Sequence, residues 1–146
     1  MIKVPAERMC DGSPLQINGR LDLGVFARNI LEVAQRNGIN LEIAQDECKV
    51  GGGLFTKAEP CVVVYNADHK RDYYSYVFTT SAQGNFNYLL QYAAGESKNW
   101  KNQVLTEKSG FVAKKLFGPN KQKQNEEHMY YQAVQNIFSE ALSNSL

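Results

Sequence analysis

The stretch from Lys49 to Lys57, KVGGGLFTK, combines three glycines with a threonine and a lysine, the residue types of a phosphate-binding loop. Such a loop needs glycines spaced G-x-x-x-x-G, followed directly by Lys and then Ser or Thr, because its backbone N–H groups and lysine surround the phosphates. Here the glycines are contiguous, and Thr56 precedes Lys57 instead of following it. We therefore interpret this stretch as a flexible connection between two strands.

The three cysteines and two histidines are the side chains that could hold a metal or act as nucleophiles. Structural zinc sites bring their ligands in close pairs such as C-x₂₋₄-C, whereas Cys10, Cys48 and Cys61 are widely separated. Cys10 and His69 could form a nucleophilic pair, but nothing predicts Cys10 at a helix N-terminus, where the pKa of its thiol would fall. We predict no metal and no cofactor, and we favour a non-enzymatic protein.

Lysines gather in one part of a chain whose net charge is only +1. Residues 97–125 contain seven lysines and a single acidic residue, Glu107. The candidate nucleic-acid-binding lysines within residues 98–123 are Lys98, Lys101, Lys114, Lys115, Lys121 and Lys123. Lysines of this kind neutralise backbone phosphates, but they are also typical of solvated helix faces.

Aromatic residues alternate along residues 73–80, so Tyr74, Tyr76 and Phe78 are expected on one face of a strand. Together with Tyr88 and Tyr92 they could form a surface on which the bases of single-stranded nucleic acid stack. We favour the alternative that these rings belong to the core, because burying each ring is worth about 2–3 kcal/mol. Tyr74 and Tyr76 are candidate nucleic-acid-binding residues, but we do not favour this function.

The elements that must position these residues fit one domain of 146 residues, with 43% hydrophobic and 21% charged residues. Residues 1–20 contain two prolines and two glycines and are predicted to be an irregular N-terminal arm, followed by a single domain at 21–146. No apolar run resembles a signal peptide or a membrane span. The odd number of cysteines favours a reducing cytoplasm.

A helix is predicted after residue 21. Asp22 is a suitable N-cap, apolar residues follow at helical spacing from Leu23 to Ala34, and Gly38 provides the stop. The pattern then changes to strands at 39–44, 61–66, 73–80 and 86–92, with Gly84 and Asn85 as a hairpin turn. These runs predict a meander of about four antiparallel strands.

The last third of the chain is predicted to be helical. Helices are expected from about Ser97 and from Ser109, and Asn125 is expected to cap a final helix with Glu126 and Glu127 in its first turn. The apolar stripe of the final helix includes Ile137 and must face the core. The predicted fold is therefore α+β, with a helix, a four-stranded meander, and two or three helices packed on one sheet face.

These observations favour a small non-enzymatic binding or accessory protein of the cytoplasm that acts through a surface. A protein partner or self-association is expected, and a membrane is not. Two alternatives stay open: a nucleic-acid-binding accessory factor that uses residues 98–123, and an enzyme whose site is not recognisable from sequence.

Overall fold

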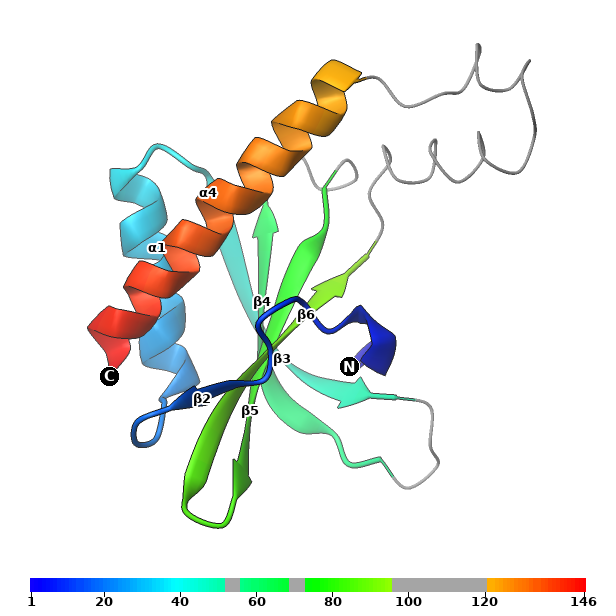
Figure 1. Ribbon diagram of the computed structural model, residues 1–146, viewed down its shortest axis with the longest axis vertical. Helices are drawn as coiled ribbons and strands as arrows, with labels where there is room; N and C mark the ends of the chain where they lie inside the picture. Colours follow the sequence, from blue (N-terminus) through cyan, green and yellow to red (C-terminus); the bar gives the residue numbers. More distant parts are fainter. Residues whose placement is uncertain (52–55, 69–72, 96–120) are drawn as a thin grey trace, which may run out of the picture.

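The computed structural model of the protein describes residues 1–51, 56–68, 73–95 and 121–146. A six-stranded sheet forms its centre, and helices α1 (Leu23–Arg36) and α4 (Lys121–Ser145) lie side by side on one face of it (Figure 1). The strands, in the order β1-β3-β4-β5-β6-β2 across the sheet, are β1 (Ile2–Val4), β3 (Leu41–Val50), β4 (Glu59–Asn66), β5 (Ser75–Gln83), β6 (Phe86–Ala94) and β2 (Leu15–Ile17). A short 3₁₀ turn, η1 (Ala6–Arg8), lies between β1 and β2.

Strands β3 to β6 form an antiparallel meander at the centre of the sheet. The β-branched side chains of β4, among them the fully buried Val62 and Val64, suit a pleated surface that is packed in the core. Gly84 and Asn85 join β5 to β6 as a two-residue turn, and Gly84 has a φ of +59°, which glycine adopts without steric cost. The predicted hairpin and its strand at 86–92 are confirmed.

The fold prediction as a whole was wrong in the number of strands and in the type of sheet. Instead of about four antiparallel strands there are six in a mixed sheet, because β1 runs parallel to β3. Both additional strands lie within residues 1–20, where we expected an irregular arm. Each has only three residues, too few to produce a recognisable period of two. They form because the outer strands of the meander offer unpaired backbone groups.

Of the two or three helices expected after the sheet, the described residues contain α4. The helices predicted from Ser97 and Ser109 lie outside the described residues. The final helix begins at Lys121 rather than at Asn125, so Asn125 and Glu127 lie further along the helix than the predicted cap and first turn. Lysine and glutamine have high helix propensity, which explains the additional turn at this end.

Helix α1 has the boundaries that its sequence predicts. The Asp22 carboxylate accepts hydrogen bonds from the backbone N–H groups of Gly24 and Val25, at 2.8 and 3.1 Å. These are donors that the first turn of a helix would otherwise leave unpaired. At the other end Gly38 has a φ of +70°, as expected of a glycine that follows a helix.

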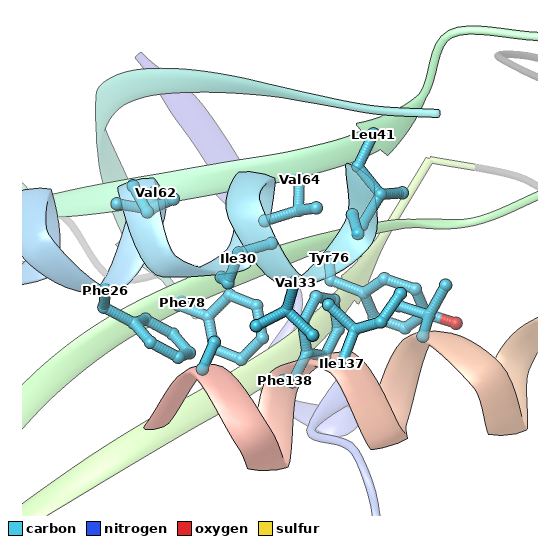
Figure 2. Packing of buried hydrophobic residues seen from close by; sticks show 14 of the residues in the cluster. Phe26, Ile30, Val33, Leu41, Val62, Val64, Tyr76, Phe78, Ile137 and Phe138 are labelled. Atoms are coloured by element: carbon cyan, nitrogen blue, oxygen red, sulfur yellow. The ribbon is translucent and has the colours of Figure 1, made fainter. Parts of the chain in front are cut away.

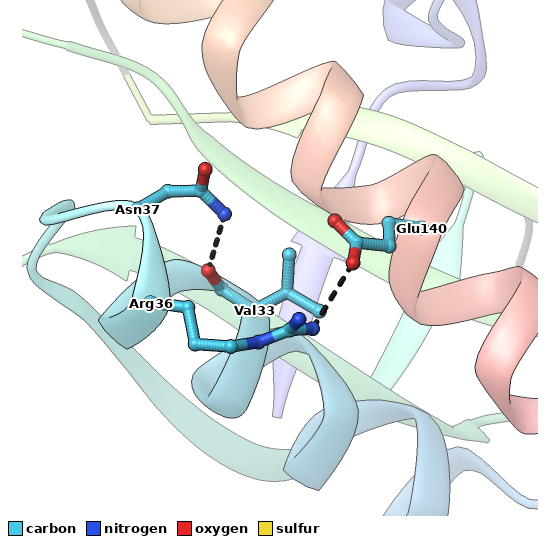
Figure 3. Close-up of polar contacts among 4 residues, drawn as sticks. All are labelled: Val33, Arg36, Asn37 and Glu140. Carbon is cyan, nitrogen blue, oxygen red and sulfur yellow. Dashed lines mark hydrogen bonds and ion pairs between the residues drawn. The ribbon is translucent and has the colours of Figure 1, made fainter.

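The main core lies between the sheet and the two helices (Figure 2). The ring of Phe78 on β5 makes edge-to-face contacts with Phe26 of α1 and Phe138 of α4, with centroids 5.1 and 4.7 Å away. One strand residue thus connects both helices. At the surface of the same interface, the Arg36 guanidinium donates to the Glu140 carboxylate at 3.0 Å (Figure 3).

The register of β5 and β6 divides the aromatic residues between the two faces of the sheet. Tyr92 lies opposite Val77, and Tyr88 lies opposite Ser81. Residues opposite each other share a face, so both tyrosines lie on the face away from Tyr76. The hypothesis of a single aromatic face, which we considered from the sequence, was therefore wrong.

Candidate binding pocket

A pocket of about 550 Å³ lies where the chain entering β5 meets the N-terminal half of α4. We call it the tyrosine pocket, because five of the ten lining residues that the structure describes are tyrosines. Its lining consists of Cys10, Tyr73, Tyr74, Tyr76, Ala93, Gln124, Glu127, His128, Tyr130 and Tyr131. A volume of this size is typical of small-molecule sites, for which roughly 300–1,000 Å³ is usual.

Helix geometry explains how α4 contributes to this lining. Gln124, Glu127, His128 and Tyr131 follow one another at intervals of three, one and three residues, which places them on one stripe of the helix. The next turns of the same helix bury Val134 and other apolar residues in the core. The helix therefore presents a polar and aromatic surface at its beginning and an apolar surface towards its end.

The tyrosine rings contact one another across elements. Tyr73 stacks on Tyr130 of α4, with ring centroids 4.6 Å apart and an angle of 23° between the planes. Tyr76 of β5 lies against Tyr131, at 6.2 Å, and against Phe138, at 5.5 Å. Since Phe138 belongs to the core, Tyr76 connects the wall of the pocket to the packed interior.

A buried asparagine fixes the hydroxyl group of Tyr130. Asn66, at the end of β4, is 7% exposed, and its side-chain oxygen accepts the backbone N–H of Asp68 at 2.8 Å. The side chain of Asn66 also hydrogen-bonds the Tyr130 hydroxyl. Buried amides need such partners, so this arrangement holds Tyr130 in one orientation.

The Cys10 thiol and the buried tyrosine hydroxyls of the pocket are held in their neutral forms. Burial raises the pKa of Tyr130 to about 12, and it also raises the pKa values of Tyr76 and Tyr131. Burial, assisted by the negative charge of Asp11, raises the pKa of the Cys10 thiol to about 11. Because the thiolate is the nucleophilic form of cysteine, the Cys10 thiol is poorly suited to nucleophilic catalysis.

A second depression, of about 400 Å³, adjoins the tyrosine pocket and shares Cys10, Tyr74 and Tyr131 with it. Arg8 of η1 lies at this edge, with its guanidinium carbon 5.9 Å from the centre of the Tyr74 ring. The same guanidinium donates a hydrogen bond to the carbonyl oxygen of Gly95. The η1 turn thus places a cation over one of the aromatic walls.

The residues proposed from the sequence for nucleic-acid contacts have different positions in the structure. Tyr74 and Tyr76 both line the pocket, but Tyr76 is only 4% exposed and is covered by α4. Lys121 and Lys123 are exposed at the beginning of α4. Four other lysines lie outside the described residues, namely Lys98, Lys101, Lys114 and Lys115.

Sequence reasoning missed Tyr73, Glu127, His128 and Tyr131 as lining residues. The spacing of Glu127, His128 and Tyr131 along the final helix is a signal that could have indicated one shared face. The contact of Tyr73 with Tyr130 of the same helix has no signal in the sequence, because it depends on how α4 crosses the sheet.

Comparisons with protein-family models, with curated proteins and with solved structures found no match to this chain. Within the described ranges, no three His, Cys, Asp or Glu side chains are grouped as metal ligands would be. Neither of the two described helices has the length and apolar character that crossing a bilayer would require.

Proposed function

We propose that this protein is a small non-enzymatic binding protein of the cytoplasm whose ligand site is the tyrosine pocket. The observation that supports this best is the concentration of five tyrosines around a single depression of about 550 Å³. Tyrosine combines a large apolar ring with a hydroxyl that can donate or accept a hydrogen bond. A few polar groups on aromatic walls are typical of ligand pockets.

The raised pKa values of the Cys10 thiol and the Tyr130 hydroxyl favour binding over catalysis by these two groups. Acid–base catalysis at neutral pH uses groups whose pKa values lie near the working pH, whereas the pKa values of Cys10 and Tyr130 are raised to about 11 and 12. Hydroxyl groups that stay neutral are suited to holding a ligand by hydrogen bonds. Association with a protein partner or with a second copy of the chain stays a prediction.

The nucleic-acid-binding alternative gains no support from Tyr76. Base stacking needs ring faces that a base can reach, and Tyr76 is 4% exposed beneath α4. The lysines of residues 98–120 lie outside the described ranges. This function therefore stays a prediction from the sequence, and we rank it below ligand binding in the tyrosine pocket.

The proposed function can be tested by nuclear magnetic resonance on the ¹⁵N-labelled full chain, titrated with a panel of small aromatic, cationic and anionic compounds. We expect at least one compound to shift the backbone signals of Tyr73, Tyr74, Glu127 and Tyr131. Tyr131→Ala should weaken that binding. Tyr88→Ala, a matched control on the opposite face of the sheet, should leave it unchanged. Shifts confined to other regions, or none at millimolar concentrations, would overturn the proposal.

A further inference from the structure

The charges around the tyrosine pocket differ from those of the chain as a whole. Among the described residues that line it, Glu127 is the one with a formal charge at neutral pH, and that charge is negative. The tyrosine hydroxyls add no charge, since burial raises the pKa of Tyr130 to about 12 and also raises those of Tyr76 and Tyr131. The lining residues that the structure describes therefore favour a positive ligand over a negative one.

The tyrosine rings attract a positive ligand, as the Glu127 carboxylate does. The face of an aromatic ring carries negative potential, so a cation within about 6 Å of the ring centre is attracted to it. Organic ammonium groups are the ligands that protein sites built from several aromatic rings typically hold in this way. Four partly exposed tyrosines and one carboxylate around a single pocket combine both kinds of attraction.

The molecule itself contains an example of this attraction at the edge of the pocket. The Arg8 guanidinium lies 5.9 Å from the centre of the Tyr74 ring, and Tyr74 lines both the tyrosine pocket and the adjoining depression. Arg8 also donates to the Gly95 carbonyl oxygen, which holds its charge at the rim rather than in the tyrosine pocket, whose lining does not include it. An aromatic wall of this pocket is thus already paired with a cation.

We propose that the tyrosine pocket binds an organic cation, with a substituted ammonium group held by the tyrosine rings and the Glu127 carboxylate. A volume of about 550 Å³ suits an organic molecule rather than a bare metal ion. Burial also keeps the Cys10 thiol protonated at neutral pH, so this side chain is a neutral neighbour of the ligand. The inference rests on the proposed function, because it names the ligand class of the same site.

Choline and 3,3-dimethyl-1-butanol are suitable probes, because they have nearly the same shape but only choline is charged. Each is titrated into the ¹⁵N-labelled full chain while the backbone signals of Tyr73, Glu127 and Tyr131 are followed. We expect choline to bind about tenfold more tightly than the neutral alcohol, a ratio in the range of a single cation–ring contact. This comparison uses the unmodified protein and does not depend on any variant.

Glu127→Gln provides the second part of the test, with Glu126→Gln as its matched control. Glu126 is the exposed neighbour on α4 and does not line the pocket. We expect Glu127→Gln to weaken choline binding about fivefold or more without affecting the alcohol, since only the charge attraction is removed. Glu126→Gln should change neither. Dispersed spectra of both variants establish that they are folded.

The outcomes separate the two proposals. Equal affinity for choline and the alcohol, or choline binding that is unchanged in Glu127→Gln, would overturn the cation inference and leave the pocket as a site for neutral ligands. Binding of only an anionic or neutral aromatic compound at the pocket would do the same. If none of the compounds shifts the pocket signals, both the inference and the proposed function fail.

Discussion

The ring of Tyr73 stacks on the ring of Tyr130, with centroids 4.6 Å apart and planes 23° from parallel. Tyr73 lies just before β5, whereas Tyr130 belongs to α4 and hydrogen-bonds Asn66 at the end of β4. The stacked pair thus connects the last helix to two neighbouring strands at the wall of the tyrosine pocket. It fixes the position of the helix face that carries Glu127.

A double-mutant cycle measures this contact. Tyr73→Ala and Tyr130→Ala should each lower the free energy of unfolding in urea, and their coupling energy should be about 0.5–1.5 kcal/mol, as for other aromatic pairs. Tyr130→Ala combined with Tyr88→Ala is the control, because Tyr88 lies on the opposite face of the sheet. Effects of Tyr73→Ala and Tyr130→Ala that add to within about 0.3 kcal/mol would contradict the stacking.

Two residues of α4 should differ strongly in their effect on stability. Phe138 is 4% exposed and contacts Phe78, so Phe138→Ala should cost about 3–5 kcal/mol. Glu140 forms an ion pair with Arg36 in which both side chains are about half exposed. Glu140→Ala should therefore cost less than about 1 kcal/mol. Chemical denaturation measures both, and equal costs would show that α4 does not pack on the sheet as described.

The strong local patterns of the sequence predicted their elements correctly. Asp22 and Gly38 set the ends of α1, and Gly84 with Asn85 set the hairpin. These signals act over a few residues, where capping and turn chemistry decide the conformation. A helix cap alone does not decide a boundary, however, since α4 begins before Asn125.

The edge strands and the pocket could not be predicted in the same way. The pairing of Ile2 with Cys48, or of Leu15 with Leu89, depends on which edges the meander leaves open. The pocket depends on the path of α4 across the sheet, which an apolar stripe does not specify. Long-range geometry of this kind has no counterpart in the spacing of residues along the chain.

Gln135 should be replaceable with a gain in stability. The side-chain nitrogens of Gln135 and Gln91 are buried without hydrogen-bond partners among the described residues, and both residues line a cavity of about 130 Å³ that also contacts Phe26. Because an unpaired buried donor costs about 1–3 kcal/mol, Gln135→Leu should raise the free energy of unfolding by about 1 kcal/mol. Gln132→Leu, at an exposed position of the same helix, should change it by less than about 0.5 kcal/mol. A clear loss of stability in Gln135→Leu would show that the amide is hydrogen-bonded in solution.

Stability should fall as the solution becomes alkaline, because of the buried thiols. Burial raises the pKa of Cys61 from 9.0 to about 12. Above pH 9 the unfolded chain releases this proton while the folded chain keeps it, so the free energy of unfolding declines as pH rises from 9 towards 12. The stabilising contribution is complete below pH 9.

Thermal unfolding between pH 7 and 10.5 tests this effect. The decline should be smaller in Cys61→Val, which has no thiol to titrate. Val63→Ala, at a non-titrating position of the same strand and on the same face as Cys61, should lower stability at every pH without changing the slope. Slopes that are identical in the wild type and in Cys61→Val would mean that the thiol of Cys61 does not contribute.

Nucleic-acid binding should be weak or absent at physiological salt. Tyr76 is 4% exposed, so its ring cannot serve as a stacking surface in this conformation, and phosphate contacts by lysines would have to supply the affinity. We expect fluorescence anisotropy with labelled single-stranded DNA or RNA to give dissociation constants no tighter than about millimolar at 150 mM salt, weaker than ordinary non-specific binding.

Nucleic-acid binding by the lysines would be recognised by its dependence on salt. If four of the lysines in residues 98–123 contacted phosphates, log affinity would fall with log salt at a slope near −3, from about −0.7 per contact on single strands. Lys114→Glu with Lys115→Glu would then weaken binding to all sequences equally, because phosphate contacts carry no base information. Lys3→Glu with Lys49→Glu makes the same change of charge at paired positions of β1 and β3 and should have no such effect. Two results together would overturn our ranking: low-micromolar binding of the wild type at 150 mM salt, and loss of that binding in the Lys114/Lys115 variant alone. Nucleic-acid binding would then be a better supported function than ligand binding in the tyrosine pocket.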